Sequence, residues 1–208
     1  MSAACFIVGA APDSGPIRFT PEPGDLVIAA DGGYARLKAL GISPDIAIGD
    51  FDSLGFVPDG ACVHATEKND TDMMLAVRLG LQKGYQSFEI YGGLGGRIGH
   101  TVANIQALTF LARRAARGTL IADGTRATVI HCGSIAFSAA ARGFLSVFAL
   151  DSEVRGVTVS GLKYPLVNAT LTNEFPIGVS NEFIGEKSSV SVDDGTLLII
   201  WEQGGYVD

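Results

Sequence analysis

Gly49-Asp50-Phe51-Asp52-Ser53 directly follows the apolar run Ile46-Ala47-Ile48, and the expected fold is organised around this stretch. The apolar run predicts a buried strand, and Gly49 permits a sharp change of direction where the strand ends. Side chains two positions apart in an extended backbone point the same way, so Asp50 and Asp52 should face one spot. Paired carboxylates suit Mg2+, which takes one or two carboxylates together with water and phosphate oxygens. An isolated Asp-x-Asp is equally typical of a polar turn that closes a strand.

Strands alternate with helices on both sides of this stretch. We expect strands at 4–8, 25–30, 46–48, 88–91 and 119–122, and helices at 34–40, 71–83 and 100–117. The expected buried helix positions are Met74, Val77 and Leu81 in the second helix, and Val102, Ile105, Leu108 and Ala112 in the third. The alternation predicts an α/β domain with a mainly parallel, Rossmann-like sheet. Because ligands bind at the carboxyl ends of such strands, Asp31, Asp50 and the loop from Gly92 should gather at one edge.

The second half of the chain has a different rhythm. From about residue 127, strand-like runs at 144–150, 157–160, 188–192 and 196–201 follow one another without helical periodicity. They predict an all-β sandwich. Asp193-Asp194-Gly195 predicts a hairpin between the last two runs, because glycine supplies a positive φ. We therefore expect an α/β domain at 1–125 and a β-sandwich domain at 126–208.

Composition narrows the classes of partner and compartment. The chain has 208 residues, a net charge of -7 and a pI of about 4.9, so nucleic acid and anionic membranes are not expected partners. Its three cysteines, Cys5, Cys62 and Cys132, lack metal-ligand spacing, which is typical of a reducing compartment. No apolar stretch approaches the roughly 20 residues that span a bilayer. We expect a soluble cytoplasmic protein.

Several further features carry a structural interpretation, a functional one or both. Asn69-Asp70-Thr71-Asp72 precedes a predicted helix and is either a plain helix cap or part of a metal and phosphate site. Residues 92–97, Gly-Gly-Leu-Gly-Gly-Arg, resemble a phosphate-binding loop ahead of a helix, although neither the Walker A nor the dinucleotide spacing is present. Arg97 could neutralise charge on a transferred phosphoryl group, and His100 is either a ligand contact or a surface residue. Trp201 is either a core residue or a stacking platform for a flat cation.

Taken together, these features resemble the thiamine pyrophosphokinase family. The matching segments occur in the family's order and cover nearly the whole chain: 30–33, 44–45, 48–53, 67–68, 71–72, 95–98, 100–101, 103–104, 161–166, 178 and 180–182. The combination of Gly-Asp-Phe-Asp-Ser with the downstream Ser180-Asn181-Glu182 is more specific than any single motif.

The resemblance implies an enzyme that converts ATP and thiamine to AMP and thiamine diphosphate. It also implies a homodimer whose active sites lie where the sandwich of one subunit meets the α/β domain of the other. By position, the implied catalytic residues are Asp50, Asp52, Asp72 and Arg97, and the three aspartates are also the implied Mg2+ ligands. The implied nucleotide-binding residues are Asp31, Gly32, Gly33, Ser53, Gly95, Gly96, Arg97 and His100. Ser180 and Asn181 match residues expected near the thiamine pyrimidine.

Two positions depart from the family pattern. Asn69 stands where the family commonly has the first aspartate of Asp-x-Thr-Asp, and Gly99 stands where it commonly has an aspartate before the histidine. We hypothesise that Asp70 compensates for the carboxylate that is missing at position 99. Two other functions remain open from the sequence: a nucleotide-sugar transferase that uses Asp-Phe-Asp as its metal motif, and a thiamine- or nucleotide-binding regulatory protein with weakened activity.

Overall fold

The chain folds into two compact units, Met1–Asp123 and Gly124–Asp208. This computed structural model describes residues 3–11, 15–49 and 70–203. Asp50, Asp52 and Ser53, together with Asn69, lie outside the described residues, so the predictions made for them stay predictions.

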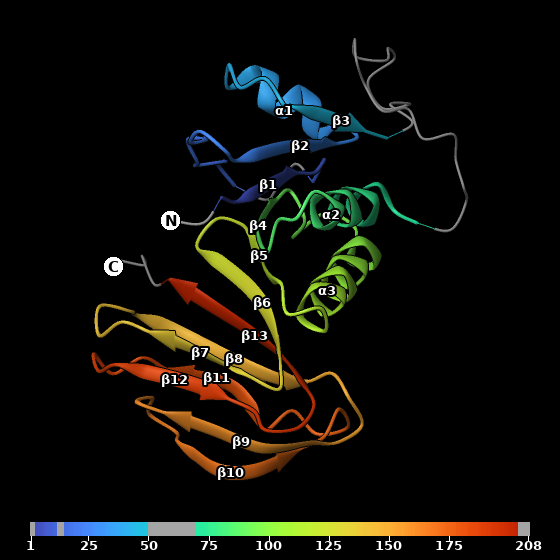
Figure 1. The fold of residues 1–208 in the computed structure, drawn as a ribbon. Helices are drawn as coiled ribbons and strands as arrows, with labels where there is room; N and C mark the ends of the chain where they lie inside the picture. The colour runs from blue at the N-terminus through green and yellow to red at the C-terminus, as the bar shows by residue number, and fades with distance from the viewer. Residues whose placement is uncertain (1–2, 12–14, 50–69, 204–208) are drawn as a thin grey trace. The chain divides into compact units, whose positions relative to one another are not determined.

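The first unit is built on a parallel sheet. Its strands are β1 (Cys5–Val8), β2 (Leu26–Ala30), β3 (Ile46–Ile48), β4 (Ser87–Tyr91) and β5 (Arg117–Ile121), and its helices are α1 (Gly33–Ala39), α2 (Asp72–Gln82) and α3 (Ile98–Ala112). The strand order is β5-β4-β1-β2-β3, and every neighbouring pair runs parallel (Figure 1). The predicted α/β class with a mainly parallel sheet is therefore confirmed for this unit.

Helices cover both faces of this sheet. Phe6 and Val8 of β1 pack in one core cluster with Leu37 of α1. The alternate residues face the other helices, because Gly80 of α2 lies against the side chains of Cys5 and Phe88. Strands that are buried on both faces need apolar residues at every position, which explains the continuous apolar run of β1.

The predicted bounds of α2 are confirmed to within one residue, and Val77 and Leu108 are buried as predicted. The other positions predicted to be buried need correction: Met74 and Leu81 in α2, and Val102, Ile105 and Ala112 in α3. Met73, Ala76, Val77 and Gly80 are the buried residues of α2, whereas Asn104, Ala107, Leu108 and Leu111 are those of α3. The face of α2 is rotated because Gly80, which has no side chain, admits the ring of Phe88. Helix α3 ends at Ala112, five residues early, because Ala115 takes a positive φ of 59° and the chain turns into β5. Within the described residues, no helix combines the length and apolar content needed to cross a membrane.

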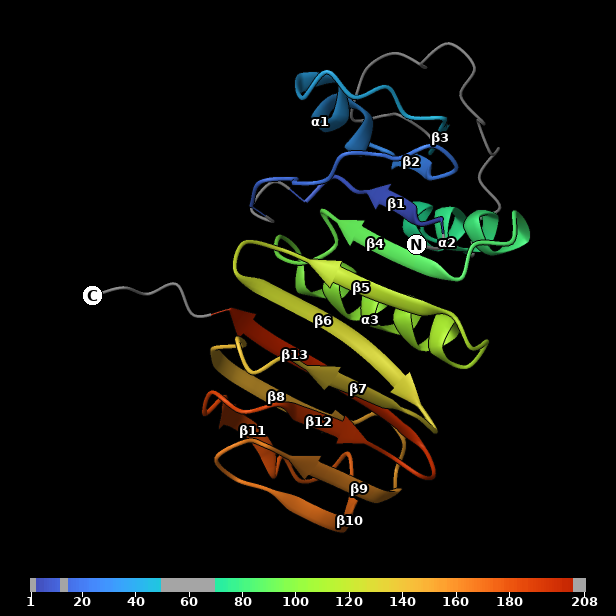
Figure 2. The same cartoon turned by 60° about the vertical axis from the view of Figure 1, so that its left-hand side comes forward.

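The second unit contains only strands. They are β6 (Thr125–His131), β7 (Ser134–Phe137), β8 (Gly143–Ala149), β9 (Val154–Ser160), β10 (Leu166–Leu171), β11 (Gly178–Glu182), β12 (Ser188–Ser191) and β13 (Thr196–Gln203). Strands β11-β8-β13-β6 form one antiparallel arrangement and β10-β9-β12-β7 form another (Figure 2). The predicted all-β class of the second half is confirmed.

One core serves both antiparallel arrangements. Leu145 of β8, Leu197 of β13 and Val157 of β9 belong to the same buried cluster. Trp201 is 9% exposed in this cluster and meets Phe137 edge to face, with ring centroids 5.3 Å apart. The core-packing interpretation of Trp201 is therefore the one that the structure favours.

The hairpin predicted at Asp193-Asp194-Gly195 is wrong. β12 pairs with β7 and β9, whereas β13 pairs with β6 and β8, so these three residues carry the chain from one sheet to the other. The backbone N–H groups of Asp193 and Asp194 both donate to the carbonyl of Arg155. The positive φ expected at Gly195 is present, at 108°, but it belongs to the connection between two sheets and not to a hairpin turn. A turn signal thus predicted the local conformation and not the strand pairing.

Candidate active site

The carboxyl ends of four neighbouring strands meet at one edge of the parallel sheet. Gly9, Asp31, Gly49 and Gly92 are the first residues after β1, β2, β3 and β4. The N–H of Gly9 donates to the carbonyl of Tyr91 at 2.7 Å, and the N–H of Asp31 donates to that of Ile48 at 2.8 Å. Asp31 is thereby held beside Gly49, the residue that precedes Asp50. The predicted gathering of Asp31 and the loop from Gly92 at this edge is confirmed.

Glycines allow the backbones to touch at this edge. A Cβ on Gly33 would clash with the carbonyl oxygen of Val8. A Cβ on Gly9 would lie 2.8 Å from the carbonyl oxygen of Gly92. Because these obstacles are backbone atoms, they cannot move aside as a flexible side chain would. Gly33, which the sequence assigns to the nucleotide site, is required here by packing as well.

Asp31 adopts an unusual backbone conformation. Its φ is 47°, in the left-handed region that residues other than glycine rarely occupy. The carbonyl of Asp31 accepts a hydrogen bond from the N–H of Tyr34 at 3.1 Å, so this residue starts the turn into α1. Local strain of this kind collects at functional sites. It supports the site prediction for Asp31 independently of its sequence motif.

The first turn of α2 faces the same edge. Thr71 is the N-cap, and its side chain accepts from the N–H of Met74 at 3.2 Å. Asp72 is the first helical residue, and the side chain of the next residue, Met73, lies 2.9 Å from the Cβ position of Gly9. The expected helix cap is present, and it holds Asp72 close to the strand ends. A cap and a functional acid are therefore not exclusive interpretations here.

Asp70, proposed as the compensating carboxylate, forms an ion pair. Its carboxylate lies 3.3 Å from Nε of Arg78, in the second turn of α2. Both side chains are partly exposed, so the pair is screened and adds little to stability. Asp70 is accessible to solvent, and its assignment as a compensating group stays a hypothesis.

The glycine loop after β4 is anchored at its start and exposed at its end. Asn104 of α3, a buried residue, donates from its side-chain amide to the carbonyl of Gly93 at 2.7 Å. Residues 95–100 are exposed, and they include Gly95, Gly96, Arg97 and His100 of the predicted nucleotide site. Ile98, the first residue of α3, is 80% exposed, an apolar side chain beside a loop otherwise suited to an anion. An exposed loop that runs into a helix N-terminus can receive a phosphate group.

Two residues that hold this edge were missed as functional candidates. Asn104 lies on the true buried face of α3, where a polar residue signals a specific hydrogen bond. Arg36 lies three residues after the buried Gly33, so a cation stands on the same face of α1 as that glycine. A charged residue on a buried helix face was the available signal. Burial lowers the pKa of Arg36, although a guanidinium stays protonated at neutral pH.

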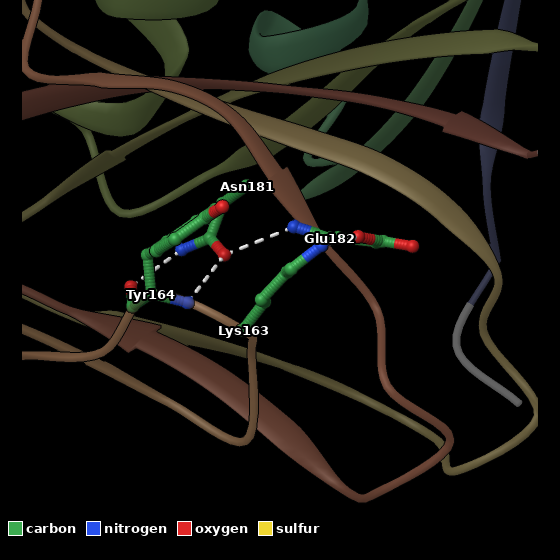
Figure 3. Close-up of polar contacts among 4 residues, drawn as sticks. All are labelled: Lys163, Tyr164, Asn181 and Glu182. Carbon is green, nitrogen blue, oxygen red and sulfur yellow. Dashed lines mark hydrogen bonds and ion pairs between the residues drawn. The ribbon is translucent and has the colours of Figure 1, made fainter.

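Asn181 of the second unit is held by three hydrogen bonds to backbone groups (Figure 3). Its side-chain oxygen accepts from the N–H groups of Tyr164 and Glu182, each at 2.9 Å. Its Nδ2 donates to the carbonyl of Tyr164 at 2.6 Å. Asn181 is 9% exposed, and its side chain attaches the loop that precedes β10 to strand β11. One amide N–H remains beyond these three bonds.

The surroundings of Asn181 are more open. Ser180 has a positive φ of 57°, and its N–H donates to Oγ of Ser146 at 3.1 Å. Tyr164 is 61% exposed. The ammonium of Lys163 lies 2.7 Å from the carboxylate of Glu182, which raises the pKa of Lys163. The structure therefore brings Ser180 and Asn181 together with an exposed aromatic ring and an exposed ion pair.

The expected metal ligands are only partly described. Among the residues that the structure describes, no group of three or more His, Cys, Asp or Glu side chains could hold a metal ion. Of the three carboxylates predicted to bind Mg2+, Asp72 alone lies in the described ranges.

Comparison with known proteins accounts for both units. Residues 22–119 match the family model described as "Thiamin pyrophosphokinase, catalytic domain". Residues 134–197 match the model described as "Thiamin pyrophosphokinase, vitamin B1 binding domain". The chain belongs to the thiamine pyrophosphokinase family. This assignment favours neither the nucleotide-sugar transferase nor the regulatory protein.

Relatives and solved structures of the thiamine pyrophosphokinase family agree with this assignment. Thiamine pyrophosphokinase of Bacillus subtilis (strain 168) is 29% identical over an alignment of 184 residues that covers 84% of this chain and 86% of that protein. A crystal structure of the Bacillus subtilis protein has a TM-score of 0.82 at 27% identity and covers 96% of this chain and 99% of its own. The Geobacillus thermodenitrificans structure has a TM-score of 0.84 at 26% identity, with 98% and 99% covered.

Proposed function

We propose that this protein is a Mg2+-dependent thiamine pyrophosphokinase, which transfers a pyrophosphoryl group from ATP to the hydroxyl of thiamine. The observation that carries the proposal is the occurrence of both matched domains in one chain, catalytic first and vitamin B1 binding second. The carboxyl-end edge of the first unit supports it, because Asp31, Asp72 and the exposed glycine loop lie at or beside that edge.

The two units take different roles in this proposal. Residues 1–125 form a Rossmann-like domain that binds ATP and Mg2+, with Asp31, Gly32, Gly33, Ser53, Gly95, Gly96, Arg97 and His100 on the nucleotide side. Residues 126–208 form a β-sandwich that binds thiamine, with Ser180 and the remaining amide N–H of Asn181 near the pyrimidine. A net charge of -7 suits the cationic thiazolium of thiamine.

The reaction needs positioning and charge neutralisation more than covalent chemistry by the protein. The thiamine hydroxyl attacks the β phosphorus of ATP and gives up its proton to water, a new O–P bond forms, and the bond from that phosphorus to the AMP oxygen breaks. Arg97, exposed at the start of α3, neutralises negative charge on the transferred group in this proposal. The glycine loop and the N-terminus of α3 bind phosphate oxygens.

Carboxylates provide the hard oxygen ligands that Mg2+ prefers, and Asp50, Asp52 and Asp72 would hold it. The position of Asp72 fits this role, because the first turn of α2 packs against Gly9 at the end of β1. When bound, Mg2+ neutralises phosphate charge and orients the phosphate chain.

Product analysis tests the proposed reaction. Purified protein is mixed with ATP, Mg2+ and thiamine, and the products are separated by chromatography. We expect equal amounts of AMP and thiamine diphosphate, almost none with Asp52→Asn, and normal amounts with Glu22→Gln, a matched change at an exposed carboxylate. ADP with thiamine monophosphate would overturn the pyrophosphoryl assignment. Binding of both substrates without any product would favour the regulatory alternative.

We also propose a cytoplasmic homodimer with active sites at the subunit interface. Mixing Asp52→Asn with an Asn181 variant tests the shared site, because each heterodimer would contain one intact site. Refolding the two inactive variants together should restore about a quarter of the wild-type rate if subunits exchange at random. A mixture that stays inactive, with subunit exchange verified, would place both groups in one subunit.

A further inference from the structure

Arg36 connects α1 to the segment that follows β1. Its Nη1 donates to the carbonyl oxygens of Gly9 at 3.2 Å and Ala11 at 2.8 Å. Its Nη2 donates to the carbonyl oxygen of Gly15 at 3.2 Å. One guanidinium thus binds three carbonyls of a single segment. The planar fork of arginine suits this task, because its donors diverge in fixed directions.

The segment held by Arg36 also contacts the glycine loop after β4. The N–H of Ala11 donates to the carbonyl of Gly92 at 3.3 Å. The Cβ of Ala11 lies 4.0 Å from the Cβ position of Gly96. Ala11 therefore contacts the start of the loop and lies near one of its exposed glycines.

Arg36 also approaches the glycine loop directly. A Cβ on Gly92 would lie 2.6 Å from Nη1 of Arg36, so the guanidinium occupies the space beside that glycine. Gly92 has a φ of 69°, a conformation that an L side chain rarely adopts. The loop conformation and the position of the guanidinium are therefore mutually dependent.

We propose that Arg36 is a positioning residue for ATP binding. Arg36 fixes the loop at 92–96 through Gly92 and Ala11. The proposal rests on the proposed function, in which this loop binds the nucleotide. Arg36 acts through backbone groups and not by contact with substrate. Loss of the Arg36 side chain therefore weakens ATP binding, because Arg36 holds the loop that binds ATP. The thiamine-binding residues of the second unit are unaffected.

Kinetics with each substrate varied in turn tests this role. We expect Arg36→Met to raise the KM for ATP by about tenfold, because small displacements of a binding loop are costly, while the KM for thiamine stays within about twofold. Arg36→Lys keeps the charge but loses the fork, and we expect an increase of about threefold for ATP.

Arg114→Met is the matched control. Arg114 donates from Nη1 to the carbonyl of Phe110 and stacks on that ring at the other end of α3. Its removal takes away a guanidinium from the same unit without touching the loop, so the KM for ATP should stay within about twofold of wild type.

Titration calorimetry with ATP and Mg2+ separates failure of this proposal from failure of the proposed function. The dissociation constant for ATP should rise with Arg36→Met and Arg36→Lys in the same order as KM, whether or not product forms. Unchanged ATP affinity in both folded variants would overturn the proposal. Equal increases in both KM values, or loss of folding in both Arg36 variants, would also overturn it, because Arg36 would then serve only general stability.

Discussion

The two candidate regions of this protein are built on different physical principles. At the carboxyl-end edge of the first unit, backbones contact each other directly, and glycines at 9, 33 and 92 leave the room they need. Around Asn181 in the second unit, a side-chain amide spans the gap between two backbone segments. The first arrangement is governed by excluded volume and the second by hydrogen bonding.

The difference predicts how each region responds to substitution. Where backbones touch, any added atom has nowhere to go, and the cost is steric. Where an amide spans a gap, removal of the side chain leaves N–H and C=O groups unpaired, and the cost is desolvation. The two regions can therefore be separated by stability measurements on single variants.

Gly33→Ala should give the largest effect in the first unit. The new Cβ would clash with the carbonyl oxygen of Val8, a backbone atom of the central β1, so the strand or the helix must shift. We expect a loss of about 3 kcal/mol or more in the free energy of unfolding, measured by urea titration. Gly99→Ala is the matched control, since no neighbouring atom of the described residues lies within 4 Å of its Cβ position and alanine favours helix. Equal stabilities of the two variants would contradict the steric account.

Asn181→Ala should give the next largest effect, and it tests the second unit. The substitution leaves the N–H groups of Tyr164 and Glu182 without their acceptor in a partly buried place. We expect a loss of about 2 kcal/mol in the free energy of unfolding. Glu182→Gln, which breaks only an exposed ion pair with Lys163, should leave the unfolding midpoint unchanged within error. A larger effect of Glu182→Gln would show that the ion pair, and not the amide, holds this loop.

The same contrast explains what the sequence could and could not predict. Strand ends marked by Asp31 and Gly92 are visible as residue types at the end of apolar runs, so the edge of the parallel sheet was predictable. The bonds of Asn181 join it to a backbone 17 residues away in the chain, and no residue type at Tyr164 signals that partner. Side-chain to backbone contacts of this kind depend on tertiary placement.

The wrong predictions have the same origin. The glycine at 195 correctly indicated a positive φ, but local chemistry cannot say whether a turn pairs its flanking strands or sends them to different sheets. The face of α2 was misjudged because Gly80, which is buried against Phe88, does not count as apolar in a periodicity argument. Close packing around glycine is what sequence periodicity misses.

The close packing of the first unit extends to Cys5, and pH dependence tests it. Burial raises the pKa of the Cys5 thiol from 9.0 to about 12. Between these values the unfolded chain has lost the proton while the folded chain keeps it, so stability falls as pH rises. We expect the wild type to lose about 1 kcal/mol more than Cys5→Ala between pH 8 and pH 10, measured by urea titration under reducing conditions. Parallel pH profiles would indicate that the thiol is hydrated in the folded state.

The N-terminus of α3 is the exception within the first unit, because it is open. Helix α3 has no acidic residue in its first turn, and within the described part of the chain no neighbouring atom lies within 4 Å of the Cβ position of Gly99. Gly99→Asp should therefore be accommodated without a clash and should stabilise the protein by about 0.5 kcal/mol through the helix dipole. A destabilised Gly99→Asp variant would show that this end of the helix is as constrained as Gly33.

Combined with Asp70→Asn, the same variant tests whether Asp70 replaces the carboxylate that the family commonly has at position 99. Asp70→Asn should slow product formation, and Gly99→Asp in that background should restore much of the rate, because either carboxylate would serve. Arg78→Gln controls for the ion pair, since it breaks the contact with Asp70 but keeps the carboxylate. An unchanged rate in Asp70→Asn would end the hypothesis. If the variant that combines Asp70→Asn with Gly99→Asp stays slow, a carboxylate at position 99 does not replace that of Asp70.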